Sequence, residues 1–392
     1  MFSTEVRVGA VYVVVVTAWT REALTFETMV RQGLSSRRPF GVADAVRSVL
    51  ALQAQEPAAP YLALWNRIEG FDANDLDRAL ADGAVVKASL FRFTLHAVDA
   101  GDLPWVRSAM RTRVRDAGYH DVLDDIGLTA ARVDEILERL STVMAEPHGS
   151  VDVERVLSEF VPEAGDPARL WSALRAVGAF RHAPTTDPWS FGRRPAFLPC
   201  TVAADDEAAA TAELVRRYLA AFGPATVADL SQFTILKRSA LRQVVDSMAD
   251  VVAVAGPDGA QLVDVNGGGP RPGADTATLP PRLLGMWDSV LLAYADRSRV
   301  IPDEHRPHVI RRNGDVLPTV VVEGLVRGVW RASTDAIEVR ALEPLDDATL
   351  DSLDEEARDL RRLLADREPA VFSRFGRWWD RLPDGPTITI GS

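Results

Sequence analysis

The chain has 392 residues, of which 47% are hydrophobic and 26% charged, and its net charge at pH 7 is −12. This length exceeds what one small hydrophobic core supports, so two or three domains are expected. Cys200 is the single cysteine, which excludes an internal disulfide framework and a cysteine-rich zinc site and fits a reducing cytoplasm. The six histidines show no metal-binding spacing, and we expect neither a metal nor a cofactor.

Residues 1–20 contain an apolar stretch, VRVGAVYVVVVTAWT, that superficially resembles the core of an export signal. It has no small-residue cleavage site and is too short to span a bilayer. We expect an N-terminal extension, either an extra strand or the product of a start codon assigned too early. No other run is long and apolar enough for a membrane.

The charge is distributed unevenly along the chain. Residues 335–368 hold 12 acidic residues against five arginines, whereas arginines gather elsewhere. Since salt screens charges beyond about 10 Å, a net-acidic chain can still present a basic face. The acidic balance therefore weakens a DNA-binding function without excluding it. The arginine clusters are Arg31, Arg37, Arg38 and Arg47; Arg107, Arg111, Arg113 and Arg115; and Arg297, Arg299, Arg306, Arg311 and Arg312.

Short helices followed by two strands open the chain after residue 20. In residues 42–55 the spacing of Val42, Val46, Val49 and Gln53 predicts a helix with Gln53 on its apolar stripe. This order of elements is that of a winged helix, which we assign to residues 21–145. The predicted helices are 20–33, 42–55, 60–70 and 72–83, and the predicted strands are 84–89 and 91–98.

The same order of elements recurs twice, which predicts a second winged-helix domain at residues 146–205 and a third at 206–270. The third contains a helix, turn and helix at residues 226–248, followed by strands. Residues 271–392 form a β-rich C-terminal element with terminal helices. Its expected parts are a Gly/Pro-rich linker at 266–282, strands within 287–300, and a hairpin at 318–333 that turns at Glu323-Gly324. The fold class is α+β and mainly helical.

Several segments resemble, in content and in order, the winged-helix DNA glycosylases typified by AlkZ and YcaQ, over about residues 22–380. The resemblance implies a C-shaped monomer of three tandem winged helices that binds double-stranded DNA and is associated with the nucleoid. It also implies hydrolysis of the N-glycosidic bond of purines alkylated at N3 or N7, and the unhooking of interstrand crosslinks. The segments are LQAQEPAAPYLALWNRIEGF, FRFTLHAV, FGPATVADLSQF, LLGMWDSVLLAYADRSRVIPDEHRPHVIRRNG and VEGLVRGVW.

In this family the catalytic signature is Gln, any residue, then Gln or Asp, and Gln53-Ala54-Gln55 matches it. The family's Arg-Gly-Thr-Leu-His is replaced here by Arg92-Phe93-Thr94-Leu95-His96. A large aromatic side chain therefore stands in place of glycine, a departure that bears on pocket shape and on substrate.

An alkylated purine already carries positive charge and leaves without a proton, so the enzyme has only to hold a water against the sugar. A glutamine amide accepts from that water and donates elsewhere without titrating. On a continuous helix residues i and i+2 do not meet, but Pro57 is expected to end the helix near Gln55 and to let Gln53 and Gln55 converge. The alternative is that both amides cap free carbonyls at the helix end.

Candidate DNA contacts come from four segments. Arg92, Thr94 and His96 alternate along a predicted strand and are expected to share a face, with Arg92 on a phosphate and His96 on sugar or phosphate. The alternative is a wing strand with a satisfied histidine. Two other functions stay open, a non-catalytic winged-helix DNA binder or transcriptional regulator and a protein-interaction scaffold. The remaining candidate contacts are Arg37, Arg38, Arg297, Arg299, Arg311 and Arg312.

Overall fold

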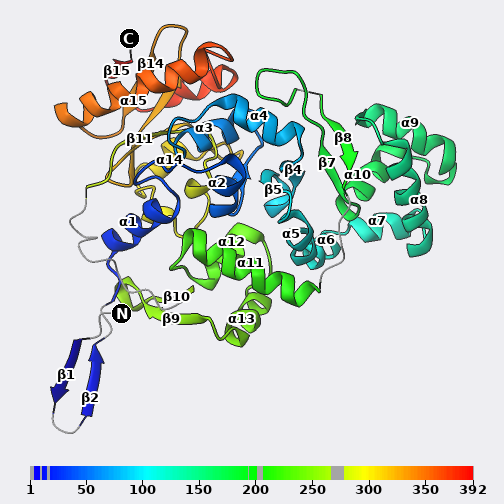
Figure 1. Ribbon diagram of the computed structural model, residues 1–392, viewed down its shortest axis with the longest axis horizontal. Helices are drawn as coiled ribbons and strands as arrows, with labels where there is room; N and C mark the ends of the chain where they lie inside the picture. Colours follow the sequence, from blue (N-terminus) through cyan, green and yellow to red (C-terminus); the bar gives the residue numbers. More distant parts are fainter. Residues whose placement is uncertain are drawn as a thin grey trace.

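A computed structural model describes residues 4–8, 11–15, 18–192, 194–200, 206–265 and 278–391 (Figure 1). Strands β1 (Thr4–Val8) and β2 (Val11–Val15) pair as an antiparallel hairpin that projects from the body, two strands where a single extra strand was one of the two expectations. Most of the predicted linker, residues 266–277, lies outside the described residues. Among the helices of the described ranges, none combines the length and apolarity that crossing a membrane requires.

Four helices form the first part of the body, largely as predicted. Thr20 accepts from the N–H of Ala23 at 3.0 Å and so caps the first helix, while Asp72 caps the fourth from Asn74 at 2.9 Å. They are α1 (Arg21–Arg31), α2 (Val42–Ser48), α3 (Ala59–Trp65) and α4 (Ala73–Ala81).

The second of these helices ends seven residues earlier than predicted, and Gln53 is not on it. Leu50 adopts a left-handed backbone with φ of 70°, and Leu52–Gln53 form strand β3. The apolar run from Val49 to Leu52 is fully buried, and a short buried strand has the same apolar signature as a buried helix. The proposed helical stripe through Gln53 was therefore wrong.

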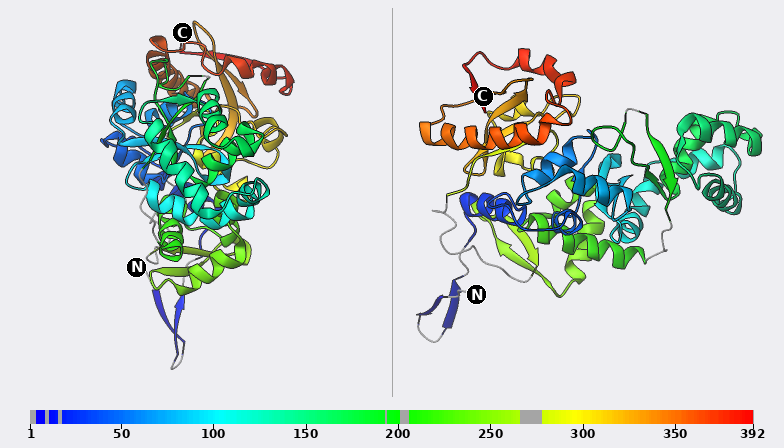
Figure 2. Two further views of the ribbon diagram at one scale, coloured as in Figure 1. Left: turned by 90° about the vertical axis from the view of Figure 1, so that its right-hand side faces the viewer. Right: turned by 45° about the horizontal axis from the view of Figure 1, so that its top comes forward.

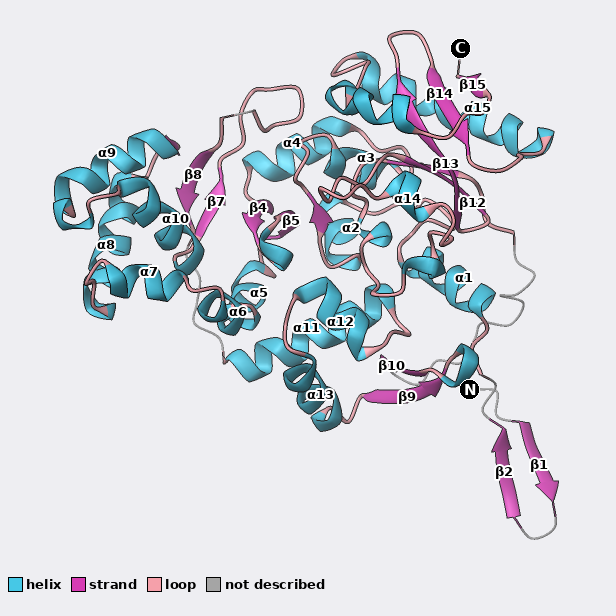
Figure 3. Cartoon of the chain, turned by 180° about the vertical axis from the view of Figure 1, so that it is seen from behind, coloured by secondary structure: helices cyan, strands magenta, loops and turns pink. Residues whose placement is uncertain are grey.

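An antiparallel sheet of six strands joins segments that the sequence placed in separate domains. Its order is β3-β5-β4-β7-β8-β6, and Lys87 of β4 pairs with His182 of β7 at the junction (Figure 3). The predicted first and second winged-helix regions thus share one sheet. Its other strands are β4 (Val85–Ser89), β5 (Leu95–Asp99), β6 (His148–Gly149), β7 (Phe180–His182) and β8 (Ala196–Pro199).

Helices α7–α10 pack around a small hydrophobic core of their own. That core is built on Leu140, Leu157, Leu170 and Trp171, each buried, and it lies apart from the main core. This part of the chain projects to the right in Figure 1 and in the right-hand view of Figure 2. The helices here, with the two that lead into them, are α5 (Leu103–Ala109), α6 (Arg111–Asp116), α7 (Tyr119–Asp125), α8 (Ala130–Val143), α9 (Ser150–Phe160) and α10 (Pro167–Val177).

The predicted helix, turn and helix of residues 226–248 is present and is followed by a hairpin. Thr226 and Asp229 form a reciprocal capping box at the start of α12, with the Thr226 hydroxyl accepting from the Asp229 N–H at 3.1 Å. The elements are α11 (Glu207–Phe222), α12 (Val227–Thr234), α13 (Arg238–Ser247), β9 (Val251–Ala255) and β10 (Gln261–Val265).

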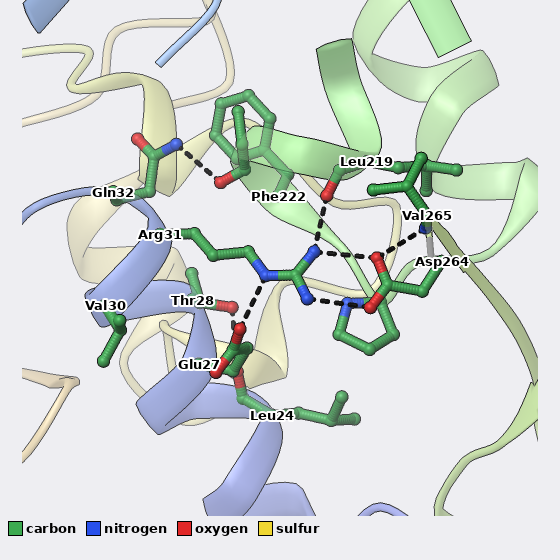
Figure 4. A network of polar contacts seen from close by, with 12 residues as sticks. Leu24, Glu27, Thr28, Val30, Arg31, Gln32, Leu219, Phe222, Asp264 and Val265 are labelled. Carbon is green, nitrogen blue, oxygen red and sulfur yellow. Dashed lines mark hydrogen bonds and ion pairs between the residues drawn. The ribbon is translucent and has the colours of Figure 1, made fainter. Parts of the chain in front are cut away.

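A buried polar network ties this third segment to α1 (Figure 4). The Arg31 guanidinium donates to both carboxylate oxygens of Asp264 and to the carbonyl of Leu219, each at 2.7 Å. Its Nε donates to Glu27 at 2.7 Å. Burial opposes the charge on Arg31, but the hydrogen bonds and charges of Asp264 and Glu27 outweigh burial and raise its pKa. The first and third segments are therefore held as one body.

A five-stranded antiparallel sheet forms the C-terminal element, with the long helix α15 lying along it (Figure 3). The predicted hairpin is confirmed, because Glu323 and Gly324 have φ of 51° and 76° between β12 and β13. The elements are β11 (Arg282–Leu284), α14 (Arg306–Val309), β12 (Thr319–Val322), β13 (Leu325–Ala332), β14 (Ile337–Ala341), α15 (Asp347–Ala365) and β15 (Thr387–Ile390).

The strands predicted within residues 287–300 were wrong. Asp288 and Asp296 each accept from a backbone N–H two residues ahead, at 3.1 and 3.0 Å, and each begins a 3-10 turn. Such aspartates offer the backbone a local alternative to a strand ladder. Among the described residues, helical residues far outnumber strand residues, so the expected mixed and largely helical class holds.

Candidate active site

The two glutamines of the Gln-x-Gln segment both lie against the start of strand β5. Leu52 and Gln53 pair with Ala97 and His96, and the N–H of Ala54 continues the ladder to the carbonyl of Leu95 at 2.8 Å. The Gln53 amide donates to the Thr94 hydroxyl at 3.3 Å, and the Gln55 carbonyl oxygen accepts from the Leu95 N–H at 3.5 Å. Extended pairing, rather than a proline break in a helix, brings the two amides to one place.

The side-chain amides of Gln53 and Gln55 differ in how freely they can reorient. Gln53 is 5% exposed, and its oxygen also accepts from the N–H of Ala54 at 3.1 Å, so its orientation is fixed. Gln55 is exposed and its one hydrogen bond is long, which leaves its amide able to turn toward a ligand. Neither glutamine caps a helix end, because α2 ends at Ser48 and the bonds run to Thr94, Ala54 and Leu95.

Gln55 forms part of the wall of a cleft of about 880 Å³. The cleft lies between the end of the β4–β5 strand pair, at Ser89 and Leu95, and helices α5–α8 and α10. Its lining contains a single carboxylate, Asp134, against four arginines. The site is therefore locally positive although the whole chain is negative. The arginines are Arg107, Arg111, Arg115 and Arg175.

The cleft arginines are held to different degrees. Arg107 donates to the carbonyl of Gly178, and Arg115 pairs with Glu207 at 3.1 Å. Arg175 has its guanidinium 5.2 Å from the ring centroid of Phe197 and no carboxylate partner in the described part of the chain. The cluster at residues 107–115 was visible in the sequence, but Arg175 was missed because it lies in an ordinary amphipathic helix.

Arg92, Thr94 and His96 do not share a strand face, so that prediction was wrong. Phe91–Phe93 form a 3-10 turn, and the strand begins only at Leu95. Arg92 donates to the Phe233 carbonyl at 2.9 Å, and burial lowers its pKa to about 10.

His96 lies inside the protein and is 1% exposed, which agrees with the alternative of a satisfied histidine. Its Nδ1 lies 3.0 Å from the Thr94 carbonyl oxygen, and its ring meets Phe91 edge to face at 5.3 Å. Burial lowers the pKa of His96 to about 3, so the ring is neutral at physiological pH.

Arg37 and Arg38 are occupied by the protein itself. Arg37 forms a bidentate pair with Glu356 of α15, at 3.1 and 2.6 Å, and its guanidinium lies 4.6 Å from the Trp65 ring centroid. Arg38 donates to the carbonyl of Val30 at 2.6 Å. Arg37 therefore links α3 to α15, and Arg38 links the segment that follows α1 back to α1.

Three of the four remaining candidates also donate to backbone carbonyls. Arg297 bonds to Leu291 at 3.1 Å, Arg299 to Pro224 at 2.7 Å and Arg311 to Trp378 at 3.1 Å. Arg312 differs, because it is exposed and makes no hydrogen bond or ion pair with any described residue. Among the nine predicted DNA contacts, Arg312 presents the most available charge.

A buried lysine near the glutamines escaped the sequence analysis. Lys87 is 4% exposed, with its Nζ 4.2 Å from the ring centroid of Phe191, and burial lowers its pKa to about 8. Glu56 opposes this shift, and burial raises the pKa of Glu56 although Arg374 pairs with it. A lysine within the apolar strand AVVKAS was the available signal. Within the described ranges, no group of three or more His, Cys, Asp or Glu side chains is arranged to hold a metal.

Three comparisons place this fold among known proteins. A family model described as DNA glycosylase AlkZ-like matches residues 46–363. An interstrand DNA cross-link repair glycosylase of Streptomyces sahachiroi is 25% identical over 353 residues, which cover 85% of this chain and 94% of the relative. The solved structure of the Streptomyces sahachiroi DNA glycosylase AlkZ superposes with a TM-score of 0.72 at 21% identity, over 90% of this chain and 99% of the other.

Proposed function

This chain belongs to the DNA glycosylase AlkZ-like family, and we propose that it releases purines alkylated at N3 or N7, alone or within an interstrand crosslink. A DNA glycosylase is a hydrolase of the N-glycosyl bond. The similarity to the interstrand DNA cross-link repair glycosylase of S. sahachiroi supports the crosslink as substrate. The observation that carries the proposal is Gln55 at the wall of an arginine-lined cleft, with the buried Gln53 bonded to Thr94, the neighbour of the Leu95 that Gln55 contacts.

In the proposed reaction a water oxygen bonds to C1′ as the bond from C1′ to the purine nitrogen breaks. The electron pair of that bond goes to the purine and cancels its positive charge, so no general acid is needed. The water gives up its proton to solvent. The protein has to hold the water in a fixed position, which lowers the entropic part of the activation barrier.

Gln55 is the amide that holds this water. It is exposed to the cleft, and its NH2 group has no protein partner among the described residues. Gln53 lies behind it with both ends of its amide engaged, by Thr94 and by Ala54, so it orients the site. An amide keeps the same charge across the physiological range, which makes the pair a water clamp rather than a titrating base.

DNA reaches the site along the arginines of the cleft. Arg175 lines the same cleft as Gln55, and phosphate contacts from such side chains fix the register of a duplex on a protein. We propose that residues 21–145, 146–205 and 206–270 act as tandem winged helices in a C-shaped monomer that works at the nucleoid. The match of the family model across all three regions supports this arrangement.

The test uses a duplex that carries one 7-methylguanine, and a second duplex with a nitrogen-mustard crosslink. The native chain should leave abasic sites in the first and separate the strands of the second. The double variant Gln53→Ala/Gln55→Ala should bind both duplexes but release no purine from either. Full release by the double variant would overturn the site, and no release by the native chain would overturn the substrate.

A further inference from the structure

Two consecutive residues beside the glutamines adopt a backbone conformation that side chains rarely take. Arg92 and Phe93 have φ of 54° and 55° within the turn Phe91–Phe93. A left-handed backbone is a genuine outlier for a bulky residue and is kept only where the surroundings impose it. Arg92 is explained by its bond to the Phe233 carbonyl. No described hydrogen bond explains why an aromatic residue follows it.

The ring of Phe93 belongs to the cleft. Phe93 is half-buried and lines the same cavity as Gln55, as does Tyr119, whose ring stands 5.7 Å away at an interplanar angle of 65°. The Arg113 guanidinium lies 5.0 Å from the Phe93 centroid and covers part of the ring. The two aromatic residues and the guanidinium form a supported wall in which the Phe93 ring has little freedom to turn away.

This wall is directly connected to the amide pair. Thr94, the next residue, accepts the hydrogen bond from Gln53, and the N–H of Leu95 meets Gln55. A base whose C1′ is presented to a water on Gln55 therefore has its ring within reach of the next side chain along this turn. The strained backbone thus places the aromatic ring in the wall of the cleft that Gln55 also lines.

We propose that Phe93 determines specificity by stacking on the purine that is released, a proposal that rests on the function proposed above. Every purine presents a π face, so stacking selects by size and charge rather than by sequence. A cationic alkylpurine is in addition attracted to the face of an aromatic ring. The ring thus favours a charged, alkylated base in the cleft over its neutral parent.

The experiment compares four variants on a duplex with one 7-methylguanine under single-turnover conditions. Phe93→Leu and Phe93→Gly both remove the ring, and the glycine adopts the left-handed backbone without strain. Phe93→Trp keeps an aromatic face. Phe40→Leu is the matched control, because Phe40 is 37% exposed and lies away from this cleft. Affinity for an undamaged duplex is measured in parallel for every variant.

Release should slow by about 10-fold in Phe93→Leu and Phe93→Gly, while Phe93→Trp stays within about twofold of the native chain. Phe40→Leu and all affinities for undamaged DNA should be unchanged. If the unsubstituted protein is active and both Phe93→Leu and Phe93→Gly release the base at the same rate, the role of Phe93 is overturned and the proposed function stands. An inactive native chain would overturn the proposed function and this proposal with it, so the two failures are distinguishable.

Discussion

Gln53 donates its amide to the hydroxyl of Thr94 at 3.3 Å, and so a residue of the β3 segment is fixed by the turn that precedes β5. The Thr94 hydroxyl donates in turn to the Phe91 carbonyl at 3.0 Å. In the proposed reaction Thr94 is therefore a positioning residue, whose bonds set the direction of the buried glutamine.

Replacing Thr94 by valine keeps the shape of the side chain but removes the acceptor for Gln53. We expect single-turnover release of 7-methylguanine to fall by about 10-fold, because a misoriented Gln53 no longer orients the site behind Gln55. Thr94→Ser keeps the hydroxyl and should restore the rate. Thr142→Val, on an exposed helix face, is the control. A native rate in Thr94→Val would show that this hydrogen bond does not position Gln53 for catalysis.

The pH profile of base release separates a glutamine clamp from a carboxylate base. Glutamine amides do not titrate, so the rate should be flat from about pH 6 to pH 7.5. Burial raises the pKa of Glu56, with Arg374 opposing, which makes Glu56 the competing base. Glu56→Gln should keep the native rate. If instead the native profile rises with pH and that rise disappears in Glu56→Gln, the carboxylate is the base.

The position of the glutamines illustrates where the sequence was informative. The resemblance selected Gln53 and Gln55, and the structure places their amides against the neighbouring residues Thr94 and Leu95, with Gln55 alone lining the cleft. The helix predicted over residues 42–55 was wrong in its second half. A left-handed Leu50 follows the end of α2, without the glycine or proline that usually signals such a stop. Single left-handed residues of this kind are imposed by tertiary packing and leave no trace in a hydrophobic pattern.

The arginines show a second limit. Composition identified the clusters, but whether a guanidinium is free depends on residues far away in the chain. Arg37 is taken up by Glu356, 319 positions further on, whereas Arg312 is exposed. The sheet that joins β4 to β7 was likewise hidden, since strand pairing between distant segments has no local signature.

The ion pair between Arg31 and Asp264 should contribute strongly to stability. Asp264 is fully buried, so Asp264→Ala leaves the Arg31 guanidinium with Glu27 as its remaining carboxylate partner and should lower the free energy of unfolding by about 3 kcal/mol. Arg21→Ala breaks an exposed pair with Asp258 and should cost less than about 1 kcal/mol. Urea unfolding measures both. Equal losses in the two variants would contradict the role of the network in Figure 4.

Buried histidines predict a loss of stability in mild acid. Burial lowers the pKa of His96 to about 3, whereas an unfolded histidine titrates near 6.5. Between these values the unfolded chain binds a proton that the folded chain does not, so the contribution is complete above about pH 6.5 and falls as pH falls. At pH 5 the loss for His96 is about 2 kcal/mol.

Urea unfolding at two pH values, near neutrality and near pH 5, measures this loss. His96→Gln should show a smaller drop between the two than the native chain, by about 2 kcal/mol. His120→Gln, which replaces an exposed ring, should show the native drop. An unchanged drop in His96→Gln would mean that the ring is protonated in the folded protein.

The central claim is that Gln55 holds the attacking water while Gln53, behind it, orients the site. Its most direct test is single-turnover release of 7-methylguanine by Gln53→Ala/Gln55→Ala, with binding of the same duplex measured alongside. We predict native affinity for DNA, native unfolding behaviour and a rate at least about 100-fold lower, the scale associated with losing a positioned reactant. Abasic sites formed at the native rate by a folded, DNA-bound double variant would contradict the account.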